Sequence, residues 1–292
     1  MANTDAGILL QLKERALTPE DAAKLVPLSI EAGWNQMEAD WTFMLQSGEG
    51  KGMTDRAGRF AACALIVPLG PAVSWISMVV TAKPWRRRGL GTRLLKDRIA
   101  DVRAAGKVAG LDATEHGKPI YEALGFRPLW ELSRWHVKRV PAKAALPPGV
   151  ELRAMRRQEL KAIAMIDKVL TGLEREHVLR HLYARAPGLA YVATEASRLR
   201  GYVLGRDGRF ATQIGPIVAT DDATARALAA RAVASAPPPF ILDVPDRHKG
   251  IQAWINEAGG EAQRHFWRMT LGDAPGLAED RPIFALAGPE LA

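Results

Sequence analysis

The sequence feature that most constrains the fold is a weak internal repeat. Three landmarks recur in the same order, at offsets of 138, 131 and 134 residues. They pair Val79-Val80-Thr81-Ala82 with Ile217-Val218-Ala219-Thr220, Leu111-Asp112 with Leu242-Asp243, and Gly125 with Gly259. Because the offsets differ by only a few residues, the pattern predicts a duplicated unit. A chain of 292 residues is long enough for two such units.

Both halves alternate strand-like and helix-like runs, which predicts an α/β fold with a mixed (α+β) sheet. In the first half we expect helices at 18–33, 37–45, 92–103 and 119–124, strands at 60–67, 73–82, 108–113 and 126–137, and a loop at 47–58. In the second half we expect helices at 156–170, 174–185, 223–235 and 251–258, and strands at 189–194, 201–205, 212–219, 240–244 and 264–271.

A stretch rich in Pro and Ala separates the halves. It runs from Pro141 to Gly149 without any periodicity, which is typical of a linker. We therefore predict an N-terminal domain at 1–140, a linker at 141–150 and a C-terminal domain at 151–292.

Cysteine content and hydropathy limit the class of protein. The single cysteine, Cys63, excludes an intramolecular disulfide and a multi-cysteine metal site, and it fits a reducing cytoplasm. Met1 to Asp5 lacks the features of a secretory signal. Residues 60–82 carry no charge and could span a bilayer, but Pro68-Leu69-Gly70-Pro71 interrupts them, so two strands joined by a turn fit better. We expect a cytoplasmic protein without membrane contact or bound metal.

The charge is unevenly distributed. The net charge is +8, of which residues 1–147 carry +6 (21 basic and 15 acidic side chains). A basic surplus predicts an anionic partner, either nucleic acid or a phosphorylated cofactor. Nucleic acid is the weaker choice, because the charge gathers in one turn with three arginines and no aromatic–basic pattern accompanies it.

That turn is Arg86-Arg87-Arg88-Gly89-Leu90-Gly91, between a predicted strand and a predicted helix. Glycines let an anion approach the backbone closely, and the free N–H groups and dipole of a helix start attract it. The alternative is an ordinary basic surface loop. No Gly-Lys-Ser/Thr follows, and the spacing differs from Gly-x-Gly-x-x-Gly, so neither common nucleotide loop is present.

The turn resembles the Arg/Gln-x-x-Gly-x-Gly/Ala pyrophosphate loop of the GCN5-related N-acetyltransferase (GNAT) family, here Arg86-x-x-Gly89-x-Gly91. Residues 75–80 resemble the family's central strand, and 111–114 resemble its next strand. Residues 117–126 contain Tyr-x-x-x-Gly-Phe, a further family signature. The resemblance covers roughly residues 18–139.

The resemblance implies acetyl-CoA as cosubstrate. Backbone amides of the loop would hold its pyrophosphate, and the main chain of Met78, Val79 and Val80 would pair with its pantetheine arm. The implied loop residues are Arg86, Arg87, Arg88, Gly89, Leu90, Gly91 and Thr92. Tyr121 stands where many members have the acid that protonates the leaving thiolate. The alternative is a half-buried core tyrosine.

The general base is not evident, because residues 75–80 contain no acid. The candidates are Asp112, Glu115 and His116, or a water that one of them holds. Each has an ordinary alternative. Asp112 could cap or bond a loop, and the other two could be solvated.

The second half departs from the family pattern. At the strand offset of 138, Thr224, Ala227 and Ala229 stand opposite Arg86, Gly89 and Gly91, and at the glycine offset Ile255 stands opposite Tyr121. We infer a degenerate GNAT-like unit that binds CoA poorly and shapes the acceptor pocket. The alternative is a scaffold.

The arrangement also resembles tandem acetyltransferases, through Gly201-Tyr202-Val203-Leu204, Gly215-Pro216 and Leu242-Asp243-Val244-Pro245. Such proteins carry a Gly-Trp-Asn segment and a later Asp-Trp, here around Trp34, Asn35 and Trp41. These three residues could line the acceptor site, or the tryptophans could be core anchors. Asp243 could hold a cationic amine, or it could bond a neighbouring turn.

The resemblance thus implies an N-acetyltransferase that moves the acetyl group of acetyl-CoA to a primary amine of a small molecule by direct transfer. The alternative is a non-catalytic acyl-CoA sensor on the same fold. We expect a monomer or homodimer.

Overall fold

The computed structural model describes residues 12–292. Met1 to Asp5, where we expect no secretory signal, lie outside the described residues. Compactness divides the chain into a first unit that ends at Gly110 and a second unit that begins at Leu111.

The first unit is built on a sheet in the order β1-β2-β3-β4-β5. Its strands are β1 (Lys13–Ala16), β2 (Glu49–Thr54), β3 (Phe60–Pro68), β4 (Val73–Thr81) and the start of β5 (Val108–Thr114), and its helices are α2 (Ala22–Glu31), α3 (Glu38–Ser47) and α4 (Leu90–Ala104). Successive strands pair antiparallel up to β4, and β4 pairs parallel with β5. The uncharged stretch 60–82 therefore forms two strands and a turn, as predicted. No helix among the described residues is long and apolar enough to cross a membrane.

Strand β2 corrects the sequence prediction, which made 47–58 a loop. Gly50 and Gly52 lie in this strand, and Leu17 and Phe60 pack over them. A Cβ at Gly52 would lie 2.8 Å from Leu17 and 2.9 Å from Phe60. Glycine, normally poor in strands, is therefore required here because large side chains cover the backbone.

The strands of the second unit follow the order β12-β6-β11-β10-β9-β8-β7, and β13 also pairs with β10. The strands are β6 (Arg127–Val137), β7 (Val150–Ala154), β8 (Tyr191–Glu195), β9 (Arg198–Arg206), β10 (Thr212–Ala219), β11 (Phe240–Pro245), β12 (Glu261–Leu271) and β13 (Ile283–Ala285). The helices are α5 (Lys118–Ala123), α6 (Leu160–Thr171), α7 (Glu176–Arg185), α8 (Asp222–Val233) and α9 (Lys249–Glu257). Parallel and antiparallel pairs coexist, so the fold is α/β with a mixed sheet, as predicted.

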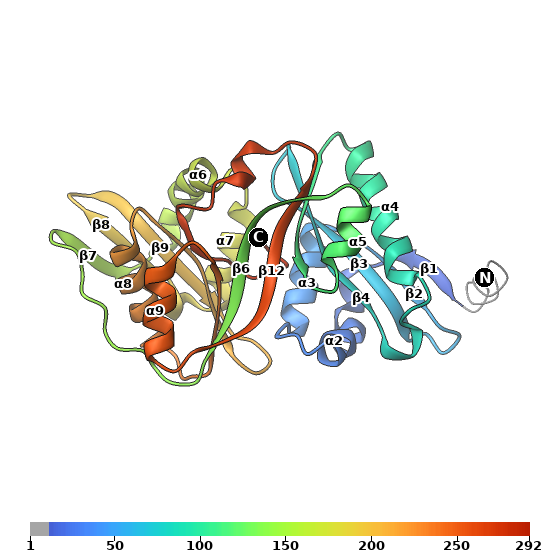
Figure 1. Cartoon of the computed structure of the whole chain (residues 1–292), viewed down its shortest axis with the longest axis horizontal. Coiled ribbons are helices and arrows are strands. Elements are labelled where there is room, and N and C mark those ends of the chain that lie inside the picture. Colours follow the sequence, from blue (N-terminus) through green and yellow to red (C-terminus); the bar gives the residue numbers. More distant parts are fainter. Residues whose placement is uncertain (1–11) are drawn as a thin grey trace. The chain divides into compact units, whose positions relative to one another are not determined.

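Strand β6 explains why compactness places the division before the predicted linker. Although β6 precedes residues 141–150, it pairs antiparallel with β11 on one side and with β12 on the other. Figure 1 shows β6 and β12 as long neighbouring strands. Residues 138–149 are irregular, and β7 begins at Val150. The domain boundaries 1–140 and 151–292 remain predictions from the sequence repeat.

The repeat is visible in the strand registers. The parallel ladder of the first unit ends at Trp75 opposite Gly110, and that of the second ends at Gln213 opposite Ile241. These pairs are related by the offsets of 138 and 131 that the sequence shows. Likewise β4 ends at Thr81 and β10 at Ala219.

Candidate functional site

The residues of the predicted anion site lie at the start of α4. Residues 82–89 connect β4 to α4, and Gly89, in the left-handed region with φ 75°, is the N-cap. The first α-helical bond that closes here is from Arg93 N to Gly89 O, at 2.9 Å. The amides from Gly89 to Thr92 therefore precede the hydrogen-bonded turns, and the positive end of the helix dipole lies among them.

The loop side chains leave this helix start open. A Cβ at Gly89 would meet no atom within 4 Å. Arg86 Nε donates to Thr81 O at 3.1 Å, which directs its guanidinium back along the loop. The guanidinium of Arg88 lies 5.3 Å from the Trp85 ring centroid. Exposed arginines thus flank free amides, an arrangement that suits a diphosphate.

Helix α4 and β4 approach each other closely at the same place. A Cβ at Gly91 would lie 3.1 Å from Thr81 Oγ1, so glycine allows the helix start to rest on the strand end. Leu90, 2% exposed, anchors the first turn in the core. The structure therefore gathers the predicted residues 86–92 at one helix end.

The residues predicted to pair with pantetheine lie in the second half of β4. Cys63 pairs with Val80 and Leu65 with Ser77, so Met78 and Val79 form a bulge opposite Ala64. The ladder with β5 ends at Trp75, whereas β4 continues to Thr81. Along these last residues, the edge on the β5 side can accept another extended chain.

A cavity of about 700 Å³ adjoins the loop within the first unit. Aromatic and basic groups share its wall with two acids. Its lining is Lys24, Pro27, Leu28, Glu31, Asp55, Gly58, Arg59, Phe60, Ala82, Pro84, Trp85 and Arg88. Since Arg59 already pairs with Asp55 at 2.8 Å, the remaining lining cations are Lys24 and Arg88.

Tyr121 lies on α5 in the second unit, half-buried. Its ring stacks edge-on against Phe126, with centroids 5.8 Å apart, and a Cβ at Gly117 would lie 2.8 Å from it. These contacts fix the ring. Burial raises the pKa of Tyr121 to about 12, so the hydroxyl keeps its proton at neutral pH.

Asp112, a candidate base, is bound on both oxygens. Arg268 Nε and Nη2 donate to Oδ1 and Oδ2, each at 2.9 Å, and the carboxylate is fully buried. Burial raises the pKa of Asp112, and Arg268 opposes that shift. This geometry favours the structural alternative for Asp112. The other two candidates, Glu115 and His116, are exposed in the turn before α5, free to reach a substrate or water.

The predicted acceptor residues have different environments. Trp41 is fully buried, and its Nε1 donates to Ser29 Oγ at 3.0 Å, which favours a core anchor. Trp34 is half-buried beside Asn35, which is 1% exposed, in the segment between α2 and α3. Thus only Trp34 retains appreciable exposure as an apolar wall.

Asp243 is buried on β11. It accepts from Arg134 at 2.7 and 2.8 Å and from Gln213 Nε2 at 2.9 Å. Both oxygens are engaged, so a cationic amine would have to compete with Arg134. The geometry favours the alternative in which Asp243 bonds its neighbours.

The helix start of the second unit corrects the alignment from the sequence. Only residues 220 and 221 join β10 to α8, whereas residues 82–89 join β4 to α4. Gly89 therefore corresponds to Asp221, and Ala227 and Ala229 lie inside α8. The uniform offset of 138 failed here because the loop itself is shorter. Ile255, opposite Tyr121, is buried in the core.

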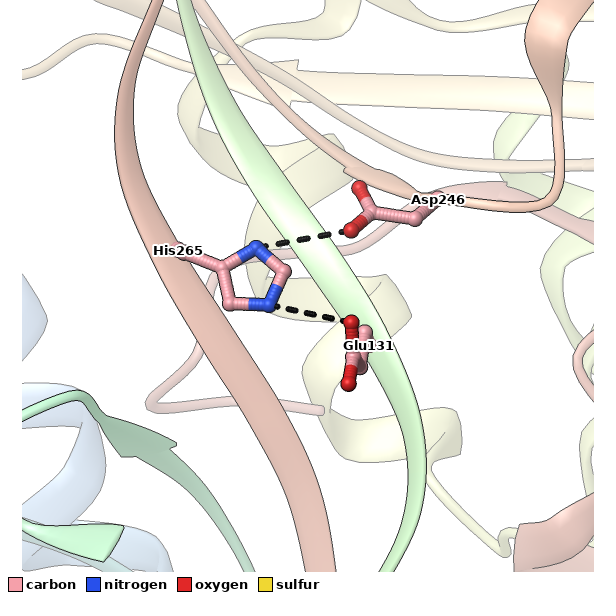
Figure 2. Close-up of side chains that lie close together, drawn as sticks. All are labelled: Glu131, Asp246 and His265. Atoms are coloured by element: carbon pink, nitrogen blue, oxygen red, sulfur yellow. Dashed lines mark ion pairs between the residues drawn. The ribbon is translucent and has the colours of Figure 1, made fainter.

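Sequence reasoning missed one titratable cluster, shown in Figure 2. His265 lies between two carboxylates, 3.3 Å from Glu131 and 3.4 Å from Asp246. Glu131 lies on β6, His265 lies on β12, and Asp246 follows β11 directly, so only the strand registers could reveal the cluster. The nitrogen and oxygen donors of these three side chains could hold a divalent cation.

Comparison with known proteins identifies related folds for both halves. Residues 62–134 and 163–285 each match a family model described as an acetyltransferase (GNAT) domain. No curated protein matches the chain. A candidate acetyltransferase from Pyrococcus horikoshii is similar in structure, with TM-score 0.77 and 18% identity over 97% of this chain and 96% of that one.

Two further solved structures resemble the chain. A GCN5-related N-acetyltransferase from Sphaerobacter thermophilus has TM-score 0.63 and 16% identity, over 89% of this chain and 95% of that one. A tandem GNAT protein from the clavulanic acid biosynthesis pathway has TM-score 0.61 and 14% identity, over 89% and 98%. At these identities the likeness concerns the fold.

Proposed function

The chain belongs to the GNAT family as a two-unit member, and on that premise we propose that it transfers the acetyl group of acetyl-CoA to a primary amine of a small molecule. The observation that carries the proposal is the open start of α4, where free amides, a left-handed Gly89 and exposed arginines meet. Family membership supports acyl transfer in general. The amides and arginines at the helix start support a donor that carries a diphosphate.

Acetyl-CoA would bind along two features of the first unit. Its diphosphate would accept hydrogen bonds from the amides at Gly89–Thr92, and its pantetheine arm would pair with β4 beyond Trp75. The bulge at Met78 and Val79 interrupts the pairing of β4 with β3 there. Positioning the thioester against a fixed strand supplies much of the rate in such reactions.

The transfer is direct. A neutral amine attacks the thioester carbonyl, the carbon–sulfur bond breaks, and a base takes the ammonium proton. Tyr121 is proposed to donate a hydrogen bond to the departing sulfur, since its raised pKa keeps the hydroxyl protonated. For the base, the exposed Glu115 and His116 are better placed to exchange protons than Asp112, whose oxygens Arg268 occupies.

The cavity beside the loop suits the nucleotide end of the donor. Trp85 and Phe60 offer aromatic surface, and Lys24 and Arg88 offer charge for a phosphate. Trp85→Ala is therefore expected to weaken CoA binding, and the gain in affinity from the 3′-phosphate should shrink in Arg88→Ala. Titrating CoA and dephospho-CoA into the two variants tests this assignment.

A thiol-release assay against pooled amines tests the proposed function. Acetyl-CoA consumption that depends on a particular amine supports the transferase. Saturable CoA binding without turnover over a broad amine panel would instead support the sensor. Absence of CoA binding contradicts both.

A further inference from the structure

The end of the chain follows an unusual course within the second unit. Segment 282–292 is buried or half-buried throughout, and β13 pairs antiparallel with β10 at Ile217 and Val218. Ala219 N also donates to Pro282 O at 3.0 Å. On its other side, Leu286 N donates to Asp243 O of β11 at 2.9 Å. The segment thus joins β10 to β11 beyond the point where their own ladder ends.

The repeat shows what this place corresponds to. The β10–β11 ladder ends at Gln213, the counterpart of Trp75, and β10 then continues to Ala219 as β4 continues to Thr81. Ile217 and Val218 are the counterparts of Val79 and Val80. The β10 edge that β13 covers is therefore the edge that, in the first unit, is proposed to receive pantetheine.

The anion position of the second unit is also filled. The α8 N-cap is Asp221, whose carboxylate accepts from Thr224 N at 2.8 Å and from Thr224 Oγ1 at 2.9 Å. In the first unit the N-cap is Gly89, which has no side chain. The Asp221 carboxylate therefore occupies a hydrogen-bond donor of the helix start, and its negative charge would repel a diphosphate there.

Buried polar contacts hold the segment in place. Glu290 pairs with Arg206, and Arg175, itself paired with Asp167 at 2.9 Å, donates to Ala292 O. A Cβ at Gly215 would collide with Leu286 O, so the backbone of β10 and the segment are in direct contact. Removing the segment would take Glu290 away from the buried Arg206, and the Ala292 carbonyl away from Arg175.

We propose that the chain itself occupies the second unit's cofactor groove, with segment 282–292 in place of pantetheine and Asp221 in place of the diphosphate. This inference rests on the proposed function, which assigns the edge of β4 beyond Trp75 to the pantetheine arm. The second unit is then a permanently filled acetyltransferase fold, and the whole chain takes up one CoA.

A tethered variant tests whether the occupant is permanent. Val218 and Ile283 face each other in the β10–β13 register, so Val218→Cys/Ile283→Cys can form a cross-strand disulfide. We expect acetyl transfer and CoA uptake to agree within about twofold between the oxidised and reduced forms. Loss of transfer on oxidation that a reductant restores would overturn the proposal, because the segment would then have to move.

Hydrogen exchange on the native chain provides the second readout. Saturating CoA should protect residues 78–92 and leave 217–222 unchanged, with native mass spectrometry giving one CoA per chain. Protection at 217–222, or two CoA per chain, would overturn the proposal. If no CoA binds, the proposed function fails, and exchange without ligand still decides the occupancy. Slow exchange at Ala219 and Leu286 supports a filled groove, whereas fast exchange contradicts it.

Discussion

Arg268 on β12 holds both carboxylate oxygens of Asp112 on β5, at 2.9 Å each, and both side chains are buried. The Arg268 guanidinium also lies 4.4 Å from the Trp130 ring centroid. An acid so engaged acts as a structural ion-pair partner, which separates Asp112 from the exposed acid Glu115.

Asp112→Asn is therefore expected to lower the free energy of unfolding rather than the rate of acetyl transfer. It leaves a buried guanidinium without its anion, a loss of about 3–5 kcal/mol. The apolar double variant Asp112→Leu/Arg268→Met removes both charges and should recover most of the melting temperature. Turnover measured per folded molecule should survive in the double variant. If it recovers stability but transfers no acetyl group over the whole pH range, Asp112 is the base after all.

Gly89→Ala is expected to weaken CoA binding, and α4 offers a matched control at its other end. Gly89 (φ 75°) and Gly106 (φ 68°) are both left-handed, and a Cβ at either position would lie in open space. Alanine at either position should cost about 1–2 kcal/mol of stability through backbone strain. Calorimetric titration should show a loss of CoA affinity in Gly89→Ala alone, and equal affinities in the two variants would refute the loop assignment.

Tyr121→Phe should lower turnover and leave CoA affinity nearly unchanged. The ring contact with Phe126 does not need the hydroxyl, so the fold should persist. The pKa of Tyr121 is raised to about 12, hence the group stays protonated below that pH. The loss in kcat should accordingly be uniform across neutral and mildly alkaline pH. If the pH–rate profile of the variant changes shape in that range, Tyr121 titrates there. That result would contradict its role as a donor that stays protonated.

Cys63 should not react with thiol reagents in the native protein. It is fully buried on β3, its Sγ donates to Met78 O at 3.4 Å, and burial raises the pKa of the thiol. An aromatic disulfide reagent should release no chromophore from the native chain and one equivalent per chain in denaturant. Rapid labelling of the native chain would show that β3 opens.

Local signals in the sequence were sufficient where one short segment carries the feature. As predicted, Arg86–Gly89 lie between a strand and a helix, and Leu90 and Gly91 form the first residues of that helix. Strand β2 was not predicted because its glycines are required by packing against Leu17 and Phe60, and no local pattern shows those contacts. The single offset for the repeat did not identify Asp221 as the counterpart of Gly89, because the loop before α8 is shorter than the loop before α4.

Features that depend on strand register could not be predicted. Glu131, Asp246 and His265 meet only because β6 lies between β11 and β12. Strand β13 is three residues long, too short for an alternating pattern, and its pairing with β10 is set by tertiary packing. The sequence repeat therefore predicted two units but not the strand that pairs with β10 in the second.

A crystal structure of the chain with CoA would show where the diphosphate binds. We expect the diphosphate within about 3 Å of main-chain nitrogens at Gly89–Thr92, with the start of α8 still capped by Asp221. A diphosphate bound away from α4, or at the start of α8, would contradict this expectation.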